Sequence, residues 1–392
     1  MVAGPTASPR RENTLTFVQV VLARNGKVQS GAEIRDNAIQ QALSLVAPCQ
    51  RLTVAPHPAQ DGSTAPAPTV VGLDAGSVAG LVRTIGALRP SLAVVEGQHL
   101  LQAITALRGA FPSLRIIVDF HNIESRLDLD IRLGTVPAAL RPVAKMLQRR
   151  HYRSAVAADI DAARIAGEVW TCSARDRDAL LALGFSGPVT VVPNPVPSWC
   201  AEGHAALAGG NEVLFVGHLS YAPNIRAVED LCRRVMPRLR RLEPAAQLHV
   251  CGRAPHPGLV SQVHARGHRL TANPDDLAPI YRQATALAVP LREGGGTRIK
   301  ILEAMAIGCP VVASAKAVEG LGLTPGMHYL AAESPDGFAN ALAGLIRDRG
   351  RAEAMVAAAA EFVRRNNGAA AVARAVRRAV ESVAAGPKDG RR

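Results

Sequence analysis

The sequence predicts an α/β fold of two domains, each built around a parallel β-sheet. Apolar, strand-like runs alternate with segments of helical period almost throughout the 392 residues, which is the pattern of parallel α/β folds. The alternation stops at residues 193–211, which are rich in proline and glycine, and then begins again. The length agrees, because such a chain exceeds one ordinary core and suits two domains of roughly 150–200 residues.

The expected elements follow this alternation in chain order. In the first half we predict strands at 15–22, 51–55, 92–96, 115–120, 168–171 and 189–192, with helices between them, for example at 32–45 and 175–183. In the second half we predict strands at 212–216, 247–251, 284–289 and 310–313, with helices at 225–242, 275–283, 297–307, 335–365 and 368–385.

These elements divide the chain into segments. We expect a loose leader (1–13), a first domain (14–195), a linker (196–211), a second domain (212–366), and a C-terminal helix with a basic tail (367–392) that packs back on the first domain. Two Rossmann-like domains joined in this way enclose a cleft, and ligands of such folds bind at the strand C-termini that face it.

The stretch from Arg292 to Ala306 carries the strongest functional signal. It follows an apolar strand-like run, contains three consecutive glycines, and continues as a helix. A glycine loop between strand and helix presents backbone N–H groups and a helix dipole to a phosphate. Arg298 and Lys300 lie at the helix start, where a structural helix favours acids. Glu303, one turn later, suits a ribose diol. An ordinary turn with surface charges is the competing interpretation.

Composition and charge exclude several classes of protein. The formal net charge of +13 predicts attraction to anionic partners such as nucleotides or phosphorylated lipids. An aromatic content of 3% and the absence of a nucleic-acid-binding signature argue against nucleic acid. Six scattered cysteines without a C-x-x-C pair indicate neither zinc nor disulfides. No run approaches the ~18 apolar residues of a membrane span, so we expect a cytoplasmic protein, either soluble or peripherally membrane-associated.

Several ordered motifs resemble those of the retaining family 4 glycosyltransferases, in the subgroup with Gly-Gly-Gly-Thr-Arg-x-Lys. In the second half they are LFVGHLSYAPN (214–224), LHVCGR (248–253), VPLREGGGTRIKILEAMA (289–306), GCPVV (308–312) and EGL (319–321). In the first half DFHN (119–122), CSARD (172–176) and VVPN (191–194) also look like that family. The resemblance covers most of the chain and implies the GT-B fold, in which two Rossmann-like domains face a central cleft.

The resemblance implies that the second domain binds a nucleotide diphosphate sugar, UDP- or GDP-linked. The diphosphate would lie against Gly295, Gly296, Thr297 and the cations Arg298 and Lys300, and the ribose at Glu303. Further donor-binding candidates, by resemblance, are Gly217, His218, Arg253 and Glu319. Turn geometry and helix capping are alternative roles for Gly217, Thr297 and Glu319.

In the first domain the resemblance points to His121 and to the first loop. His121 directly follows the predicted strand 115–120, and would contact the transferred sugar or the departing phosphate by hydrogen bonding to developing charge. We therefore expect His121, Arg298 and Lys300 to be catalytic. Gly31, with Ser30 and Arg35, resembles the loop that lies over donor phosphate and acceptor, although helix capping also accounts for these residues.

Two positions depart from the family pattern. The family spaces two glutamates by seven residues, but that spacing places Gly295 before Glu303, and Glu293 comes two residues too early. The arginine and lysine that many members carry after the first strand of the second domain correspond here to His218 and to Asn224 or a neighbour. We expect Arg298 and Lys300 to supply the phosphate contacts instead.

These observations predict a retaining glycosyltransferase that moves a sugar from a nucleotide diphosphate donor to a carbohydrate or lipid-linked acceptor. Arg298 and Lys300 would do what a divalent ion does elsewhere, so we expect neither a metal ion nor a separate cofactor. Two alternatives stay open. A nucleotide-sugar epimerase of the same fold would need carboxylates or histidines from both domains, and a non-catalytic nucleotide-sugar-binding protein would need only the cleft.

A basic segment in the first half suggests contact with an anionic membrane. Residues 131–158 contain six Arg or Lys and no acid, and the cations recur every four residues through Arg141, Lys145, Arg149 and Arg153. We predict an amphipathic basic helix over 138–153, a type of element that binds anionic lipid surfaces. A solvated face of an ordinary surface helix is the alternative.

Overall fold

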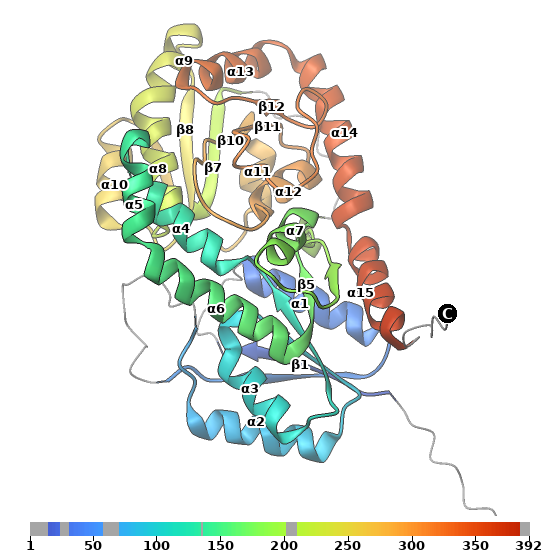
Figure 1. The fold of residues 1–392 in the computed structure, drawn as a ribbon. Helices are drawn as coiled ribbons and strands as arrows, with labels where there is room; N and C mark the ends of the chain where they lie inside the picture. Colours follow the sequence, from blue (N-terminus) through green and yellow to red (C-terminus); the bar gives the residue numbers. More distant parts are fainter. Residues whose placement is uncertain (1–14, 24–30, 58–69, 135, 201–209, 385–392) are drawn as a thin grey trace, which may run out of the picture.

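The chain folds into two α/β domains, as the sequence predicts. The computed structural model describes residues 15–23, 31–57, 70–134, 136–200 and 210–384. In these ranges each domain contains a six-stranded sheet whose neighbouring strands run parallel (Figure 1). The predicted fold class is therefore confirmed. The predicted leader, Ser30 and the basic tail lie outside the described residues.

The first domain has the strand order β2-β1-β3-β4-β5-β6. Its strands are β1 (Phe17–Leu22), β2 (Cys49–Val54), β3 (Leu92–Glu96), β4 (Arg115–Phe120), β5 (Gly167–Thr171) and β6 (Val189–Val191). Its helices are α1 (Gly31–Ser44), α2 (Ala75–Leu88), η2 (Gln98–Leu100), α3 (Leu101–Ala110), α4 (Glu124–Gly134), η3 (Ala138–Leu140), α5 (Arg141–Leu147), α6 (Arg149–Ala166) and α7 (Ala174–Ala182).

The second domain has the strand order β12-β11-β10-β7-β8-β9. Its strands are β7 (Glu212–His218), β8 (Gln247–Arg253), β9 (Arg269–Ala272), β10 (Ala286–Val289), β11 (Val311–Ala313) and β12 (Leu330–Ala331). The helices of this half are η4 (Ser198–Cys200), α8 (Ala222–Asp230), η5 (Leu231–Val235), α9 (Met236–Leu242), α10 (Pro257–His264), α11 (Ala278–Gln283), α12 (Ile299–Ile307), α13 (Pro335–Arg347), α14 (Arg349–Asn367) and α15 (Ala369–Ala384).

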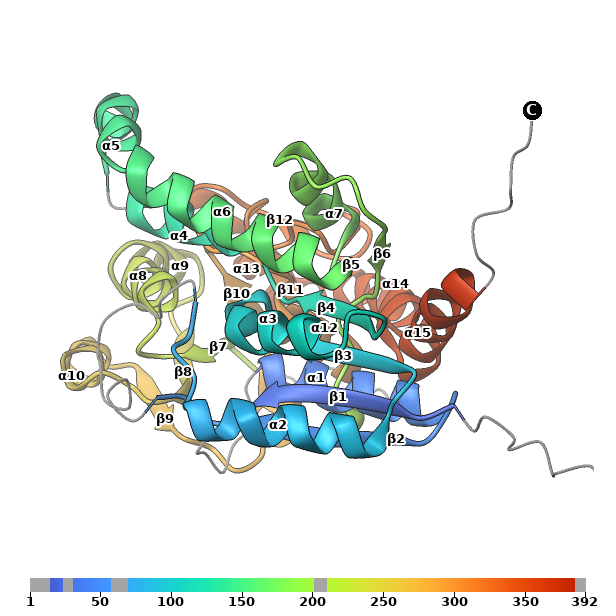
Figure 2. The same cartoon turned by 60° about the horizontal axis from the view of Figure 1, so that its bottom comes forward.

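Helices cover both faces of the first sheet (Figure 2). On one face, side chains of α2, α3 and α6 pack against alternate residues of the strands, such as Val95 and Val118. On the other face α1 and α15 enclose a second cluster that includes Phe17, Ile39 and Val376. Because both faces are buried, the strands read as nearly continuous apolar runs.

The C-terminal helix α15 belongs spatially to the first domain, beside α1 (Figure 1). The Arg115 guanidinium donates hydrogen bonds to the carbonyls of Ala379 and Val380, at 3.0 and 2.8 Å. At the joint between the domains, the Val196 N–H donates to the Asn367 carbonyl, and the Asn367 amide donates to the Asn194 carbonyl at 2.8 Å. The chain thus passes from the first domain to the second near Asn194 and returns near Asn367, and these hydrogen bonds join the two crossings.

Several element predictions differ from the structure in detail. The helix predicted at 225–242 is divided into α8, the π-helical η5 and α9. Pro237 lies in the first turn of α9 and lacks an N–H, so the regular bonding pattern cannot continue through it. Strands β9 and β12 escape prediction because they are short and only partly buried, which leaves little apolar signal.

Strand order places a crevice in each domain. In the second sheet β7 lies between β8 and β10, and in the first sheet β1 lies between β2 and β3. Connections leave in opposite directions at such a switch point, which opens a gap at the carboxyl ends of the strands where ligands bind. Among the described helices, none has the length and apolar character needed to cross a membrane.

Candidate functional site

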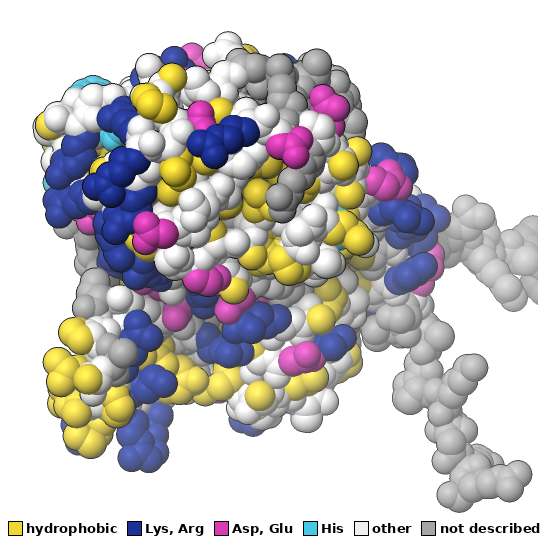
Figure 3. All heavy atoms as spheres, turned by 90° about the horizontal axis from the view of Figure 1, so that it is seen from above, with side chains coloured by type: hydrophobic (Ala, Val, Ile, Leu, Met, Phe, Trp, Pro, Cys, Tyr) yellow, Lys and Arg dark blue, Asp and Glu magenta, His cyan; other side chains and the backbone are white. Residues whose placement is uncertain are grey.

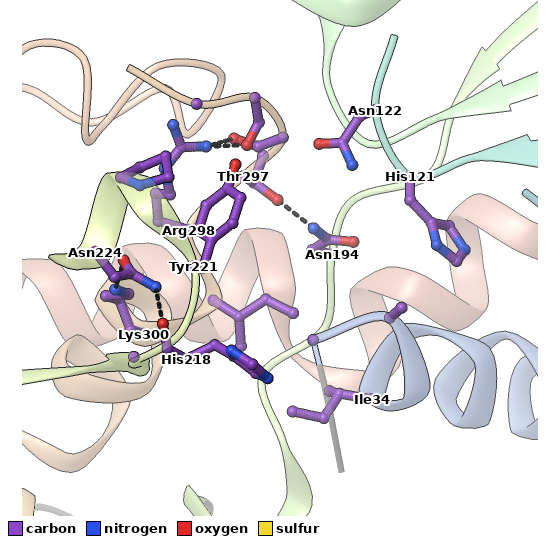
Figure 4. A pocket seen from close by; sticks show the side chains of 18 of the residues that line it. Ile34, His121, Asn122, Asn194, His218, Tyr221, Asn224, Thr297, Arg298 and Lys300 are labelled. Carbon is purple, nitrogen blue, oxygen red and sulfur yellow. Dashed lines mark hydrogen bonds between the residues drawn. The ribbon is translucent and has the colours of Figure 1, made fainter. Parts of the chain in front are cut away.

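A cavity of about 550 Å³ lies between the two domains, at both switch points. From the second domain it is lined by the loops after β7, β8 and β10 and by the start of α12. From the first domain it receives the start of α1 and the residues after β4 (Figure 4). Predicted site residues that line it are Gly31, His121, Gly217, His218, Arg253, Gly295, Gly296, Thr297, Arg298, Lys300 and Glu303.

Glu319 lies elsewhere. It lines a second cavity of about 200 Å³, which shares Gly294, Gly295 and Gly296 with the cleft. There its carboxylate pairs with Arg175 at 3.2 Å and with Lys316 at 2.9 Å. Since Arg175 belongs to the first domain, Glu319 contributes to an ion-pair contact between domains rather than to the lining of the main cavity.

The glycine loop fits closely against the first domain. Gly294 and Gly296 have φ angles of 109° and 66°, a region that side chains other than glycine rarely adopt. A Cβ atom on Gly295 would lie 3.2 Å from Leu127 and 3.4 Å from the Asn122 amide oxygen. A glutamate at position 295 would therefore require Leu127 or Asn122 to shift. Glu293 is buried and forms an ion pair with Arg226.

Arg298 supports this loop from inside. Its guanidinium donates hydrogen bonds to the carbonyls of Gly295 and Gly296, as the dashed lines in Figure 4 show. Burial lowers the pKa of the group, although the guanidinium of arginine stays charged. One of its terminal nitrogens is buried without a hydrogen-bond partner among the described residues. Arg298 thus fixes the loop and retains one donor.

Lys300 is the cation held at the floor of the cleft. Its ammonium donates to the Asn224 amide oxygen at 2.9 Å and lies 4.5 Å from the centre of the Phe215 ring. Burial, and then the charge of Arg298, lower the pKa of Lys300 to about 7. A Cβ atom on Gly217 would lie 2.8 Å from this ammonium, so the lack of a side chain at position 217 leaves room for the lysine.

Glu303 follows Lys300 by one turn of α12 and is 6% exposed. The Tyr281 hydroxyl donates to its carboxylate at 2.8 Å. Burial raises the pKa of Glu303 to about 7, against the opposite effects of Tyr281 and Lys300. The helical spacing aligns the two charged side chains on one face, so a cation and a carboxylate both reach the cavity from α12.

A chain of polar contacts joins the two domains beneath the glycine loop. The Asn194 amide donates to the Thr297 hydroxyl, and its oxygen accepts from Arg35 at 2.8 Å. Arg35 in turn donates two hydrogen bonds of 2.6 Å to the Asp119 carboxylate. Arg35 is 1% exposed, so it holds the inner wall of the site rather than presenting a free charge to a ligand.

His121 faces the cavity above a group of buried carboxylates. Its Nε2 atom lies 3.3 Å from Asp36 and 3.5 Å from both Glu96 and Asp119. Burial disfavours the charged ring, but Asp36 and Glu96 outweigh it and raise the pKa of His121 to about 10. At neutral pH the ring is therefore a cation with no lone pair for accepting a proton.

The same group of carboxylates can be compared with a metal site. Asp36, Glu96 and His121 each place one ligand atom within 4.8 Å of the others. Burial and then Asp119 raise the pKa of Glu96 to about 8, and a histidine ligand must be neutral to bind a metal. An ion bound there would have to displace the proton that gives His121 its charge.

Most of the supporting polar residues are not predicted from the sequence. Asp36 and Glu96 were not predicted, although a glutamate that ends the apolar strand β3 is itself a signal, since buried charges need partners. Asn122, Tyr221 and Tyr281 were overlooked as well, because asparagine and tyrosine are common in loops and cores.

Comparisons with known proteins agree with this arrangement. Residues 210–348 match a family model described as glycosyl transferases group 1. That range contains the glycine loop, Lys300 and Glu303. Comparison with curated protein sequences gives no match.

Solved structures resemble the chain over nearly its whole length. Sucrose-phosphate synthase from Thermosynechococcus elongatus has a TM-score of 0.69 at 16% identity, covering 95% of this chain and 99% of that chain. Pneumococcal O-GlcNAc transferase GtfA, in complex with UDP and GlcNAc, has a TM-score of 0.66 at 10% identity, covering 95% and 100%. HepE of Anabaena, in complex with UDP, has a TM-score of 0.65 at 14% identity, covering 94% and 100%.

Similarity at these identities concerns the fold. The shared feature is the pair of domains with parallel sheets that face a cleft, which is the GT-B arrangement. The chain thus has a GT-B-like fold, and its second domain is similar to the group 1 glycosyl transferases.

Proposed function

We propose that the protein is a retaining glycosyltransferase that uses a nucleotide diphosphate sugar, with UDP as the favoured nucleotide. The observation that carries the proposal is the convergence of the glycine loop, Lys300 and Glu303 on one interdomain cavity. The similarity of the second domain to group 1 glycosyl transferases supports the activity. The UDP in the complexes of HepE and GtfA supports the choice of nucleotide.

In this proposal α12 and its preceding loop bind the nucleotide. The diphosphate accepts hydrogen bonds from loop N–H groups and from the Lys300 ammonium, at the positive end of the helix dipole. The ribose diol donates to the Glu303 carboxylate. His218 and Arg253, at the ends of neighbouring strands, lie where they would contact the remainder of the donor. Arg298 keeps the loop carbonyls turned away from the phosphates.

The transfer step needs charge stabilisation more than a protein base. The acceptor hydroxyl oxygen forms a bond to the anomeric carbon on the face from which the bond to the diphosphate oxygen breaks. The hydroxyl proton passes to the departing phosphate oxygen, and the diphosphate leaves. Because His121 is positively charged, it would donate a hydrogen bond to the leaving group or the sugar, which stabilises the developing negative charge.

A pair of nucleotides tests the ribose contact. We expect UDP to raise the melting temperature more than GDP or ADP, and wild-type protein to bind UDP about tenfold more tightly than 2′-deoxy-UDP. A hydrogen bond to a charged group contributes about 1.5–3 kcal/mol. In Glu303→Gln this preference should largely disappear while the affinity for 2′-deoxy-UDP changes little. Calorimetric titration measures both, and absence of binding by any nucleotide would overturn the proposal.

Chelation tests the proposed metal independence. We expect turnover of the nucleotide sugar to survive dialysis against EDTA, because Lys300 and the loop N–H groups supply the charge stabilisation that a divalent ion gives elsewhere. A loss of activity that added Mg²⁺ or Mn²⁺ restores would show that an ion takes part.

Epimerisation of a nucleotide sugar is the second candidate, because carboxylates do gather near His121 in the first domain. They lie beneath the ring, however, and Asp36, Glu96 and Asp119 are not among the residues that line the cavity. They can hold His121, whereas Glu124 and His99 do line the cavity from the first domain. Formation of an epimer from donor alone, without an acceptor, would favour this candidate over transfer.

A further inference from the structure

The helix α5 and the turn η3 before it project from the first domain as a lobe (residues 138–147) beside the second domain (Figure 1). The predicted single basic helix over 138–153 is wrong in detail, since α5 ends at Leu147 and α6 begins at Arg149. α5 contains no buried residue. Its side chains therefore contribute nothing to the core of either domain.

This lobe exposes large apolar side chains in one place. Four of them lie within eight residues: Leu140, Val143, Met146 and Leu147, with exposed fractions of 57, 53, 68 and 74%. Figure 3 shows hydrophobic side chains gathered at this corner, at the lower left, with Lys and Arg beside them. Contiguous exposed apolar side chains with a polar rim mark interaction sites.

Cations surround the same patch. Arg141, Lys145, Arg149 and Arg150 are exposed. Within the described part of the chain, Lys145 has no hydrogen bond or ion pair, and Arg141 donates only to the Val136 carbonyl. Acidic side chains nearest in sequence lie on α4, where Asp128 already pairs with Arg132 and His151. The positive charge of the lobe is thus available to an external partner.

A cavity of about 260 Å³ opens at the base of the lobe. Arg126, Arg141, Lys145 and Arg292 line it together with Tyr152 and one acid, Asp130. Asp130 is held from the other side by Lys316 at 2.9 Å and by the Gly294 N–H at 2.9 Å. Arg292 pairs with Asp230 at 3.1 Å, so Arg126, Arg141 and Lys145 are the cations that suit the cavity to a phosphate group.

The cavity leads toward the reaction site. It shares Arg126 and Asp130 with the cavity that contains Glu319, and that cavity shares the three loop glycines with the main cleft. We propose that the lobe inserts Leu140, Val143, Met146 and Leu147 into a bilayer, while the cavity at its base binds the phosphate of an anionic lipid. Apolar insertion and charge attraction act together in such surface contacts.

Binding of the lobe to a membrane does not depend on sugar transfer. What this binding implies for the acceptor rests on the proposed function. If the cleft transfers a sugar, this surface brings its open side to acceptors that are carried by lipids. The acceptor class then becomes a membrane-borne molecule whose phosphate or headgroup lies at the lobe and whose hydroxyl reaches the cleft.

Vesicle flotation tests the docking. We expect wild-type protein to float with vesicles of phosphatidylcholine and phosphatidylglycerol, much less with phosphatidylcholine alone, and less in high salt. Arg141→Gln/Lys145→Gln should lower the partition coefficient on the order of 30-fold. Met146→Gln/Leu147→Asn should lower it at least tenfold, since two exposed apolar side chains lose their insertion.

A matched control carries the same change of charge elsewhere. Arg377→Gln/Arg378→Gln alters exposed residues of α15, far from the lobe in Figure 1, and should float like the wild type. Equal flotation with both vesicle types, or lobe variants that bind like the wild type, would overturn the proposal. The proposal would also be overturned if the wild type were a dimer that does not bind vesicles and becomes monomeric in Met146→Gln/Leu147→Asn. In that case the lobe would pair with a second copy of the chain.

Titration with UDP separates this proposal from the preceding one. All of these variants should retain wild-type affinity for UDP, since none of the substituted residues lines the main cleft. Flotation without UDP binding would refute the proposed function and leave the docking in place. UDP binding without flotation would refute the docking and leave the proposed function in place.

Discussion

Replacing Arg35 by methionine is expected to lower the free energy of unfolding by about 3–5 kcal/mol, the cost of removing one partner from a buried ion pair. Asp119 is fully buried and depends on two hydrogen bonds of 2.6 Å from Arg35. Glu96 lies opposite it in the β3–β4 register. Without the Arg35 guanidinium, His121 would be left to balance the negative charge of the carboxylates of Asp36, Glu96 and Asp119.

Arg35 also connects the two domains. It donates to the Val192 carbonyl at 2.9 Å and to the Asn194 side chain, which in turn contacts Thr297 of the glycine loop. Urea denaturation followed by tryptophan fluorescence reports the loss of stability, because Trp170 is buried in β5 and Trp199 packs against the core of the second domain. A fall in UDP affinity should accompany it under conditions where the variant is still folded, because the loop has lost its support.

Two controls identify the cause. Arg35→Met/Asp119→Leu removes both charges and should recover much of the stability, since an apolar pair of similar volume often replaces a buried ion pair without loss. Arg377→Met on the exposed face of α15 should change stability by no more than about 0.5 kcal/mol. A loss below about 1 kcal/mol in Arg35→Met would contradict the importance of the buried pair.

The pH dependence of stability follows from the same contact. Burial alone would raise the pKa of Asp119, but Arg35 outweighs it and lowers the pKa below the ordinary value. A carboxyl group whose pKa is lowered on folding stabilises the protein above its unfolded pKa of about 3.9, and this contribution is lost as pH falls through the folded value. In Arg35→Met the loss should begin at a higher pH than in the wild type.

The sequence predicts this fold well because the α/β pattern is local. Buried parallel strands such as β3 and β4 read as short apolar runs bounded by polar residues, and each is followed by a helical period. The strands that escaped prediction, β9 and β12, lie at the edges of the second sheet. There burial is incomplete and the apolar run is too short to be distinguished from a loop.

Some residues of the candidate site are likewise predictable from the local sequence, and others are not. Lys300 and Glu303 are predictable because one helix carries both, at a spacing that aligns them. The carboxylates around His121 are not, because Asp36, Glu96 and Asp119 come from three separate elements and meet only through strand order. The direction of the Arg298 side chain is equally unpredictable, since its partners are backbone carbonyls of its own loop. The position of Glu319 is unpredictable as well, because one of its two ion-pair partners, Arg175, belongs to the other domain.

Lys300→Ala is expected to lower kcat/KM for the nucleotide sugar at least tenfold, because a charge-assisted hydrogen bond to the diphosphate contributes about 1.5–3 kcal/mol. The pKa of the Lys300 ammonium is about 7, and this value distinguishes it from the arginine cations of the site. A diphosphate stabilises the ammonium, so the pKa of Lys300 should be higher in the complex than in the free protein.

The sign of the pH effect follows from this difference. Below about pH 7 the lysine is charged in both states, and its own contribution to UDP affinity is complete. Above that pH the free protein must take up a proton to bind, so affinity falls by up to tenfold for each pH unit until the pKa of the complex is reached. Calorimetry in buffers of different ionisation enthalpy counts the protons taken up.

Two variants assign the effect to Lys300. Lys300→Arg keeps its charge throughout this range and should bind UDP with little dependence on pH, even where the bulkier group reduces affinity. Glu303→Gln removes a second group with a pKa near 7, whose ionisation on raising the pH acts in the opposite direction. Glu124, which also has a pKa of about 7 and lines the cavity, stays in place in both variants. In Glu303→Gln the fall should begin at a lower pH than in the wild type, because the carboxylate no longer raises the pKa of Lys300.

Stability distinguishes lost chemistry from lost structure. Burial lowers the pKa of Lys300 on folding, so charging this lysine opposes folding and its cost grows as pH falls toward 7. Lys300→Ala should therefore melt no earlier than the wild type at neutral pH in the absence of nucleotide. If UDP binding proves independent of pH in the wild type, or Lys300→Ala retains full turnover, the phosphate-binding charge must come from another residue of the cleft.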